Sequence, residues 1–369
     1  MISRSSRLAL GLLGSATAVA AMAQSAQNSA ASSSSPATAR GETPWVAPGT
    51  PNSPIDGEMF HAQVLMSAHG FSPGVIDGKE GESFKLALRS FQESRGLERT
   101  GELDNETRRA LLQASRPSTV MVRLGATDVQ HQYVYPLPKE PEQQAELKFL
   151  GYRNMLEKVA ERYHTTPDTI VALNGSEKLI GPGQVLRLPN VVPTDRDYEG
   201  VPGNGGQVMN ILNVNGSQPQ GDYVVVDKSE GVLKVYRGSP PGEAGSEGSG
   251  DGRQLVAAFP VTMGSKQYPL PIGKWKATTY AFLPPFHYQP ELLQGADKSK
   301  EDMRLPPGPN GPVGVAWLDL TKEHYGIHGT NEPQTIGRAE SSGCIRMTNW
   351  DVMRLARMMK PGFTAIFQA

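Results

Sequence analysis

Stretches rich in proline, glycine and serine interrupt the chain and divide it into several folding units. Of its 369 residues, 40 are glycine and 30 are proline, a composition that favours loops, linkers and β-rich domains over helix bundles. A chain of this length suits two or three domains better than one core. Residues 24–54 and 191–220 have too little apolar content to pack and are predicted to be linkers. We therefore expect a multidomain protein.

The first residues of the chain have the pattern of an export signal. Arg4 and Arg7 precede a short apolar run, which leads to the small-residue cleavage site Ala21-Met22-Ala23. Residues 1–23 are therefore predicted to be a signal peptide, with residues 24–54 as a flexible linker. A membrane anchor is the less favoured alternative, because the run is shorter than the ~20 residues that a spanning helix needs. No later segment is long and apolar enough to span a membrane, so we expect an exported protein.

Charge and cysteine content narrow the classes of partner and site. The chain has 36 basic and 37 acidic residues, a net charge of -1, so it has no general basic field and nucleic acid is not an expected partner. It has no paired cysteines, no His-x-x-x-His motif and no acidic cluster with calcium-loop spacing, so no metal site is predicted. Its one cysteine, Cys344, can pair between molecules, be an inert buried thiol or act as a nucleophile.

Residues 55–115 have the pattern of three short amphipathic helices separated by turns. Asp104 or Asn105 is placed to cap the third of these helices. The order of helix and turn signals resembles the small three-helix peptidoglycan-binding-like domain. The residues that carry the resemblance are Gly70-Phe71, Val75 to Gly78, Ala87 to Gln92, Gly96-Leu97, Thr100-Gly101, Leu103-Asp104 and Thr107.

A second small unit is predicted at residues 148–191. Met155 to Tyr163 has a helical pattern, Thr166-Pro167-Asp168 opens another helix, and Pro182 to Pro189 is predicted to be a turn followed by a strand. This order resembles the later part of a LysM module, a family that binds the N-acetyl sugars of glycan strands. The first strand and the Gly-Asp-Thr turn of that family are not visible here, and a structural spacer is the alternative.

From Asp222 onward the pattern is that of β-strands. An insertion rich in Gly, Ser and Glu at residues 239–252 is predicted to be a mobile surface loop. The strand-like segments are Tyr223 to Asp227, Val232 to Tyr236, Val256 to Met263 and Val315 to Leu320.

The last part of the chain contains a histidine and the only cysteine in an arrangement suited to thiol catalysis. His328-Gly329 is followed by Cys344, which lies between Gly343 and Ile345. A catalytic thiol needs a base within reach to form the thiolate and backbone N–H groups aimed at the oxyanion. Gly343 allows a substrate carbonyl to approach the backbone, and an imidazole can take the thiol proton and later protonate the leaving amine. A structural histidine and an ordinary turn are the alternatives for these residues taken singly.

Residues 221–369 resemble the catalytic domain of the L,D-transpeptidase (YkuD-like) family. Ser342 stands where many members have a histidine, so His328 is the only histidine that the motif supplies. The matching residues are His328-Gly329-Thr330, Ile336-Gly337, Ser341 to Met347, Asn349 and Asp351, with Pro269 to Trp275, Leu305 to Pro309 and Gly314 to Ala316 upstream. The expected fold class is thus a small three-helix peptidoglycan-binding-like domain, a small α+β LysM-like module and a C-terminal mainly-β catalytic domain.

The resemblance implies a role for each matching residue. Cys344 would attack the carbonyl between diaminopimelate and the terminal D-Ala of a tetrapeptide stem, with His328 as general base and acid and no cofactor. The Gly329 carbonyl would orient the imidazole, while Ser342, Gly343 and Cys344 would frame the oxyanion site. Arg346 would hold the loop, meet a substrate carboxylate or pair with a residue such as Asp351, and Asn349 would brace the loop or contact substrate. Substrate contacts are expected of Ser341, Thr330, Arg346 and Asn349.

The acyl acceptor stays open at this point. An amine acceptor would be another stem's diaminopimelate, which gives a 3-3 cross-link, or the lysine of a wall-anchored lipoprotein. Water as acceptor would make the protein an L,D-carboxypeptidase or endopeptidase, and a non-catalytic wall-binding scaffold is a further alternative. The expected partners are peptidoglycan stem peptides, glycan strands and a carbapenem that forms an adduct at Cys344. The expected location is the periplasm, in association with the cell wall.

Overall fold

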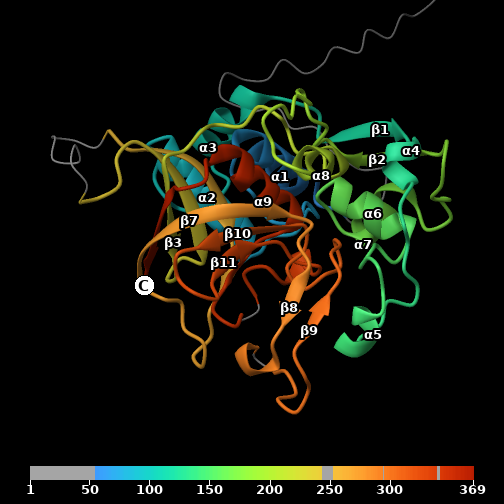
Figure 1. Ribbon diagram of the computed structural model, residues 1–369. Helices are drawn as coiled ribbons and strands as arrows, with labels where there is room; N and C mark the ends of the chain where they lie inside the picture. Colours follow the sequence, from blue (N-terminus) through green and yellow to red (C-terminus); the bar gives the residue numbers. More distant parts are fainter. Residues whose placement is uncertain (1–54, 243–251, 294, 339–340) are drawn as a thin grey trace, which may run out of the picture. The chain divides into compact units, whose positions relative to one another are not determined.

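A nine-stranded sheet forms the framework of the C-terminal part of the chain in the computed structural model, which describes residues 55–242, 252–293, 295–338 and 341–369 (Figure 1). β13 and β3 pair in parallel, as do β11 and β12, while the other neighbours are antiparallel. In spatial order the strands are β5 (Gln254–Pro260), β4 (Val232–Arg237), β3 (Tyr223–Asp227), β13 (Thr364–Gln368), β7 (Gly273–Phe282), β10 (Ala316–Leu320), β11 (Gly326–His328), β12 (Ile345–Arg346) and β6 (Thr262–Met263). The predicted mainly-β fold of this part is confirmed.

The chain itself joins the two ends of this sheet. β5 and β6 lie at opposite ends of the strand order, yet only Val261 separates them in sequence. The sequence predicted one strand from Val256 to Met263, whereas the structure divides this segment between the two edges. Because one segment belongs to both edges, the sheet wraps around an enclosed core and leaves few strand edges open.

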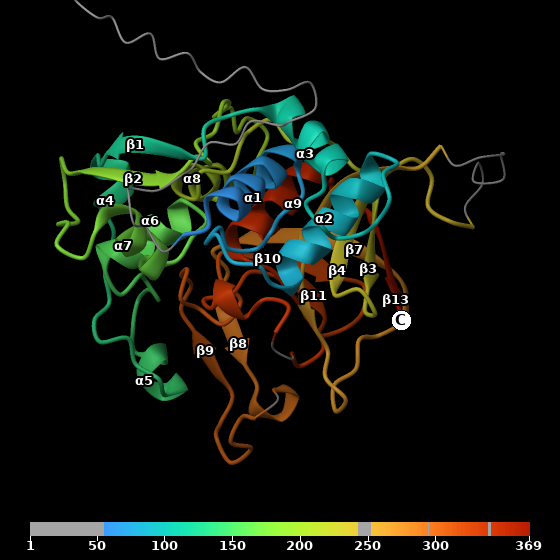
Figure 2. The same cartoon turned by 180° about the vertical axis from the view of Figure 1, so that it is seen from behind.

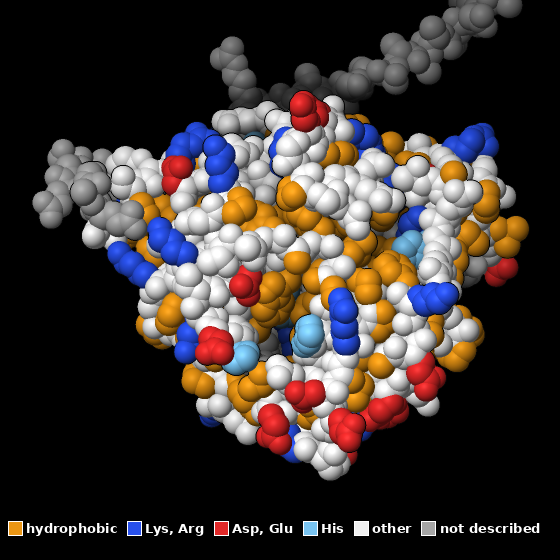
Figure 3. Space-filling view, in the orientation of Figure 1, with side chains coloured by type: hydrophobic (Ala, Val, Ile, Leu, Met, Phe, Trp, Pro, Cys, Tyr) orange, Lys and Arg blue, Asp and Glu red, His pale blue; other side chains and the backbone are white. Residues whose placement is uncertain are grey.

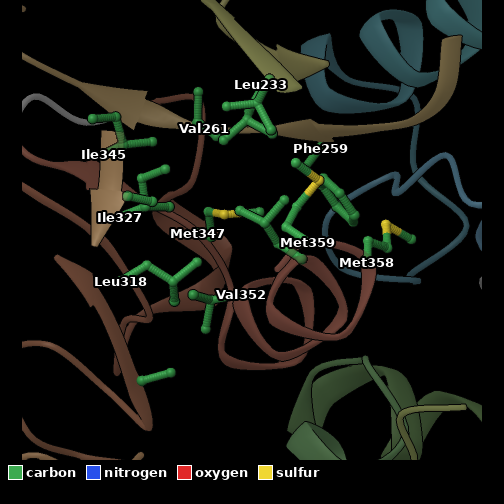
Figure 4. Close-up of a cluster of buried hydrophobic side chains, with 14 of the residues drawn as sticks. Leu233, Phe259, Val261, Leu318, Ile327, Ile345, Met347, Val352, Met358 and Met359 are labelled. Atoms are coloured by element: carbon green, nitrogen blue, oxygen red, sulfur yellow. The ribbon is translucent and has the colours of Figure 1, made fainter. Parts of the chain in front are cut away.

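Helix α9 (Asn349–Met358) packs against this core. Its N-cap is Thr348, whose hydroxyl accepts a hydrogen bond from the Asp351 N–H at 3.1 Å. The buried face of the helix holds Asn349 in place directly after the last strand of the site. Figure 4 shows side chains of this helix and its end beside side chains of the sheet, namely Val352, Met358 and Met359 with Leu233, Phe259, Leu318, Ile327 and Ile345.

Three helices at the start of the described chain confirm the predicted helical domain: α1 (Gly57–His69), α2 (Glu82–Ser94) and α3 (Asn105–Leu111), followed by the short η1 (Leu112–Ala114). The cap of α3 is Asp104, whose carboxylate accepts from the Thr107 N–H at 2.8 Å. Figure 2 shows these helices in front of the sheet.

This helical domain shares a hydrophobic core with the sheet. Val232, Leu255 and Ala258 of the sheet belong to the same buried cluster as the apolar faces of α1 and α2. Beside this cluster the Ser72 N–H donates to the Ala258 carbonyl at 2.9 Å. The Ser72 hydroxyl donates to the Asp351 carboxylate in α9 at 2.7 Å. The helices are therefore docked on the main sheet and α9 through apolar burial and buried hydrogen bonds.

A two-stranded sheet organises the middle of the chain. β1 (Thr119–Arg123) pairs antiparallel with β2 (Val185–Pro189), and α6 (Met155–Arg162) and α7 (Pro167–Asn174) lie between them in sequence. We call residues 119–191 the β1–β2 unit. The sequence placed the start of this unit at residue 148 because its first strand is separated from α6 by a long insertion with the short helices α4 (Ala126–Val129) and α5 (Pro141–Ala145). The LysM-like assignment stays a prediction.

The predicted linker at residues 191–220 is partly structured. It contains α8 (Gly205–Ile211), and Val208, Met209, Leu212 and Val214 are buried in the core of the main sheet. Further along, β8 (Phe286–Tyr288) and β9 (Met303–Leu305) form a hairpin that extends beyond the main sheet (Figure 1). The short turns η2 (Pro290–Leu292) and η3 (Pro333–Thr335) complete the elements of the described chain.

Several predictions from the sequence concern residues outside the described part. The signal peptide at residues 1–23, the linker at 24–54 and most of the insertion at 239–252 lie there. Among the described residues, no helix combines the length and the apolar character needed to cross a bilayer.

Candidate active site

The parallel pairing of β11 and β12 brings the histidine and the cysteine segments together. His328 lies opposite Arg346, and Ile327 opposite Ile345. Because side chains alternate along a strand, Arg346 and Cys344 point to the same face, and this face is the one to which His328 points. Ile327 and Ile345 point the other way, into the core. The sheet thus gathers the polar side chains of this segment on one surface.

His328 is held in one orientation and in one tautomer. Its side chain is buried, with 4% exposed, and Nδ1 donates to the Gly329 carbonyl at 2.7 Å. The ring stacks on Trp317 of β10, with 5.3 Å between centroids and 17° between planes. Because Nδ1 carries the proton, Nε2 keeps its lone pair and can act as a base. Burial, and after it the nearby Arg346 charge, lower the pKa of His328 to about 3.

Cys344 is a free, half-buried thiol at the start of β12. Sγ lies 3.6 Å from the His324 carbonyl, which is the acceptor for the thiol proton. Burial raises the pKa of the Cys344 thiol, while a hydrogen bond from the Gly326 backbone and the Arg346 charge act in the opposite direction. The directions of these two pKa shifts favour an uncharged thiol at Cys344 and an uncharged imidazole at His328.

The loop before Cys344 is braced by its own backbone and by one aromatic ring. Ser341 is buried, and its hydroxyl donates to the Cys344 carbonyl at 2.7 Å and accepts from the Gly343 N–H at 3.2 Å. Gly343 has φ = 104°, and a Cβ at this position would lie 2.6 Å from the Tyr325 ring. Only glycine fits both conditions. Ser341 thus holds the loop. Ser342 and Gly343 directly precede Cys344 in sequence, and their part in an oxyanion site stays a prediction.

The remaining predicted site residues are mostly enclosed. Thr330 is buried, and its hydroxyl accepts from the Glu332 N–H at 3.2 Å, which shapes the turn after the histidine. Asn349 is 0% exposed, so it offers no surface to a substrate here, and its side chain forms hydrogen bonds with Val315, Pro309 and Glu161. Its predicted role in bracing the loop stays a prediction. The predicted pair between Arg346 and Asp351 does not form, because Asp351 bonds to Ser72 and Arg354 instead.

Three neighbours of the site were not singled out from the sequence: Trp317, Tyr325 and Glu161. The alternation of Trp317 with the buried Ala316 and Leu318 would have placed it on the outer face of its strand. For Tyr325 and Glu161 the sequence offers no comparable signal, since their contacts depend on tertiary packing. His324 has an exposed side chain, and its backbone carbonyl contacts the Cys344 thiol.

The space-filling view shows a hollow in the face that carries the β8–β9 hairpin, surrounded by hydrophobic, histidine and charged side chains (Figure 3). Within the described residues, no group of three or more His, Cys, Asp and Glu side chains is arranged to hold a metal ion.

Two family models match the chain. Residues 221–367 match the "L,D-transpeptidase catalytic domain" family, also called YkuD, and residues 57–111 match the family described as "Putative peptidoglycan binding domain". Both ranges fall inside the corresponding predicted domains.

Relatives show the same similarity over limited lengths. The "Putative L,D-transpeptidase YkuD" of Bacillus licheniformis is 59% identical over 56 residues, which are 15% of this chain and 34% of the relative. The "Putative L,D-transpeptidase YqjB" of Bacillus subtilis is 26% identical over 149 residues, or 39% of this chain and 69% of the relative. The chain spans about a third of the length of the YkuD relatives that it matches.

Among solved structures, an L,D-transpeptidase from Xylanimonas cellulosilytica is 14% identical with a TM-score of 0.33, covering 89% of this chain and 98% of the other. The family models give the clearest similarity: residues 221–367 match the catalytic domain of the YkuD L,D-transpeptidase family, and residues 57–111 match the peptidoglycan-binding family.

Proposed function

We propose that the protein is a cysteine-dependent L,D-transpeptidase that cleaves the bond between diaminopimelate and D-Ala in peptidoglycan tetrapeptide stems. The observation that supports this most directly is the β11–β12 pairing, which puts Cys344 and His328 on one face, together with the 2.7 Å hydrogen bond that fixes Nδ1 of His328. Both residues belong to the segment that matches the L,D-transpeptidase family.

The reaction follows from the protonation states of the pair. As Sγ of Cys344 attacks the carbonyl carbon, the thiol proton passes to Nε2 of His328, and the carbonyl oxygen becomes an oxyanion. When the tetrahedral intermediate collapses, the C–N bond breaks, the proton moves from His328 to the departing D-Ala amine, and a thioester remains on Cys344. An acceptor amine then attacks the thioester, gives its proton to His328 and releases the product, after which the proton returns to the thiolate.

Other residues of the loop support these steps. Backbone N–H groups around Ser342, Gly343 and Cys344 would receive the oxyanion, which requires the Gly343 N–H to leave the Ser341 hydroxyl. Arg346 lies close enough to lower the pKa of both His328 and Cys344. A planar guanidinium at this place suits a substrate carboxylate.

The acceptor and the setting are part of the proposal. Transfer to a second diaminopimelate would form a 3-3 cross-link, and transfer to the lysine of a wall-anchored lipoprotein would attach that protein to the wall. Transfer to water would make the protein an L,D-carboxypeptidase or endopeptidase. We propose that the chain works in the periplasm after export, where stem peptides and glycan strands are available. A carbapenem is expected to acylate the same thiol.

Incubation with purified tetrapeptide muropeptides tests the reaction and separates the acceptors. Cross-linked dimers would identify an amine acceptor on another stem, tripeptides would identify water, and adducts in the presence of a lysine-terminated lipoprotein would identify protein attachment. Release of no D-Ala by the wild-type protein, with Cys344→Ala as the matched control, would reject the proposal.

A further inference from the structure

Glu161 in α6 of the β1–β2 unit reaches the catalytic part of the chain from outside the family match at residues 221–367. Its side chain is buried, and Oε1 accepts a hydrogen bond from Nδ2 of Asn349 at 2.7 Å. The other carboxyl oxygen, Oε2, has no hydrogen-bond partner among the described residues. The carboxyl is therefore bonded to Asn349, and Tyr152 forms a further hydrogen bond with it.

Asn349 in turn contacts the backbone beside His328. Its Oδ1 accepts from the Val315 N–H at 3.1 Å, and it presses on Gly329, where an added Cβ would lie 2.1 Å from Oδ1. The Gly329 carbonyl is the group that accepts from Nδ1 of His328 at 2.7 Å. Three successive contacts thus connect Glu161 with the imidazole.

The β1–β2 unit holds Glu161 at this point firmly. The Leu150 N–H donates to the Pro307 carbonyl at 2.8 Å, and the Asn310 N–H donates to the Leu150 carbonyl at 3.0 Å. Nδ2 of Asn310 also donates to the Gly151 carbonyl at 2.9 Å. The segment before α6 is therefore fixed to the loop that leads into β10, so α6 has little freedom to withdraw.

Stability of the fold alone does not account for a carboxyl at this position. Burial raises the pKa of Glu161 to about 7, although hydrogen bonds with Tyr152 and Asn349 oppose this change. A buried carboxyl costs free energy, and an apolar side chain of similar volume is often equal or better for stability. Packing alone does not explain a carboxyl at position 161, whereas a hydrogen bond that holds Asn349 in place does.

We propose that Glu161 is a positioning residue for His328, acting through Asn349 and Gly329, and that it links the β1–β2 unit to the transpeptidase site. The inference rests on the proposed function. Without the carboxyl, Nδ2 of Asn349 keeps only the Pro309 carbonyl at 3.3 Å, and the amide can turn away from Gly329. Nε2 of His328 then loses its aim at the thiol proton, and misplacement of a reacting group by ~1 Å can cost on the order of 100-fold in rate.

Three variants of the full chain test this role. Glu161→Met removes the acceptor at nearly constant volume, and Glu161→Gln keeps an oxygen that can accept from Asn349. Glu157→Met is the matched control, because Glu157 lies one turn earlier in α6 and contacts Asn310 at 3.3 Å but not Asn349. Two assays are used. The first measures kcat and KM for the tetrapeptide, and the second measures the rate of Cys344 acylation by imipenem, with intact-protein mass spectrometry as the readout.

For Glu161→Met we expect kcat and the imipenem acylation rate to fall about tenfold or more with KM unchanged. Glu161→Gln and Glu157→Met should stay near the wild type. Combining Glu161→Met with Asn349→Ala should cost no more than Asn349→Ala alone, because both act on one route.

Equal acylation rates in wild type and Glu161→Met would overturn the positioning role and leave the proposed function intact. Conversely, imipenem acylation without any turnover of tetrapeptide by the wild type would reject the proposed function alone. If Glu161→Met does not fold, Glu161→Ala removes the same carboxyl and leaves a smaller side chain. Failure of both to fold would assign Glu161 to stability only and overturn the inference.

Discussion

At the residue scale, the protein keeps its two reactive side chains uncharged by burying them. Burial lowers the pKa of His328 to about 3, and burial raises the pKa of the Cys344 thiol. The motif singled out both residues, because the residues of the proposed chemistry are close in sequence. Their environment was not predictable, since Trp317 and Tyr325 reach the site through strand pairing and loop packing.

The resting thiol should show this burial in its pH dependence. Without substrate, alkylation of Cys344 by iodoacetamide should keep rising from about pH 7 to about pH 9, because the thiolate fraction grows as pH approaches a thiol pKa above its usual ~8.5. Since the chain has one cysteine, intact-protein mass spectrometry follows the rate directly. A rate that is flat above about pH 6 would instead indicate a preformed thiolate–imidazolium pair.

Gly343 should tolerate substitution by alanine far less well than a glycine that has a similar backbone φ but open space around its Cα. Gly343→Ala should lose activity and about 1–3 kcal/mol of unfolding free energy, because the new Cβ meets the Tyr325 ring at a positive φ. Gly362 also has a positive φ, 97°, but no atom within 4 Å of an added Cβ. Gly362→Ala therefore controls for the backbone cost of about 1 kcal/mol. Urea unfolding of both variants measures the difference, and equal losses would show that the ring contact does not matter.

At the element scale, local patterns predicted the type of most elements but not their partners. The helices α1, α6 and α7 and the strands β3 and β4 follow the sequence pattern closely. The split of one predicted strand into β5 and β6 depends on closure of the sheet, which no local window contains. β1 was not joined to β2 because the insertion between β1 and α6 hides the pairing.

The Glu161 carboxyl in helix α6 should make the unfolding free energy depend on pH. The folded-state pKa of Glu161, about 7, lies above its ordinary value of 4.5, so the folded protein binds more protons than the unfolded chain between these values. The contribution of this carboxyl is fully present below about pH 4.5 and is lost as pH rises through about 7. The difference corresponds to roughly 3 kcal/mol of unfolding free energy. Tyr152 and Asn349 contact the carboxyl, and Glu157 is the nearest charge on α6.

Comparison with Glu161→Gln isolates this effect from other titrating groups. Urea unfolding at pH 5 and pH 8 should show a smaller decline for the variant than for the wild type, because glutamine does not titrate. An identical decline in both proteins would contradict a raised pKa at Glu161.

At the scale of the whole molecule, the described residues belong to one compact unit rather than to domains on flexible tethers. The α1–α3 helices share a core with Val232, Leu255 and Ala258, and Phe60, Val64 and Ile76 lie in the core of the β1–β2 unit. The sequence predicted the type of the helical domain and of the mainly-β domain correctly but left out these shared cores, since patterns within a domain carry no information on docking.

Shared cores should make unfolding cooperative. We expect residues 55–369 to unfold in one calorimetric transition, because loss of one part exposes buried apolar surface of the others. Two well-separated transitions would show that the helical domain and the sheet unfold independently.

The central claim is that Cys344 carries the acyl group. Intact-protein mass spectrometry after brief incubation with a diaminopimelate tetrapeptide should show an adduct with the mass of the stem without D-Ala, and Cys344→Ala should show neither adduct nor released D-Ala while keeping the fold. Full release of D-Ala by Cys344→Ala would contradict the account.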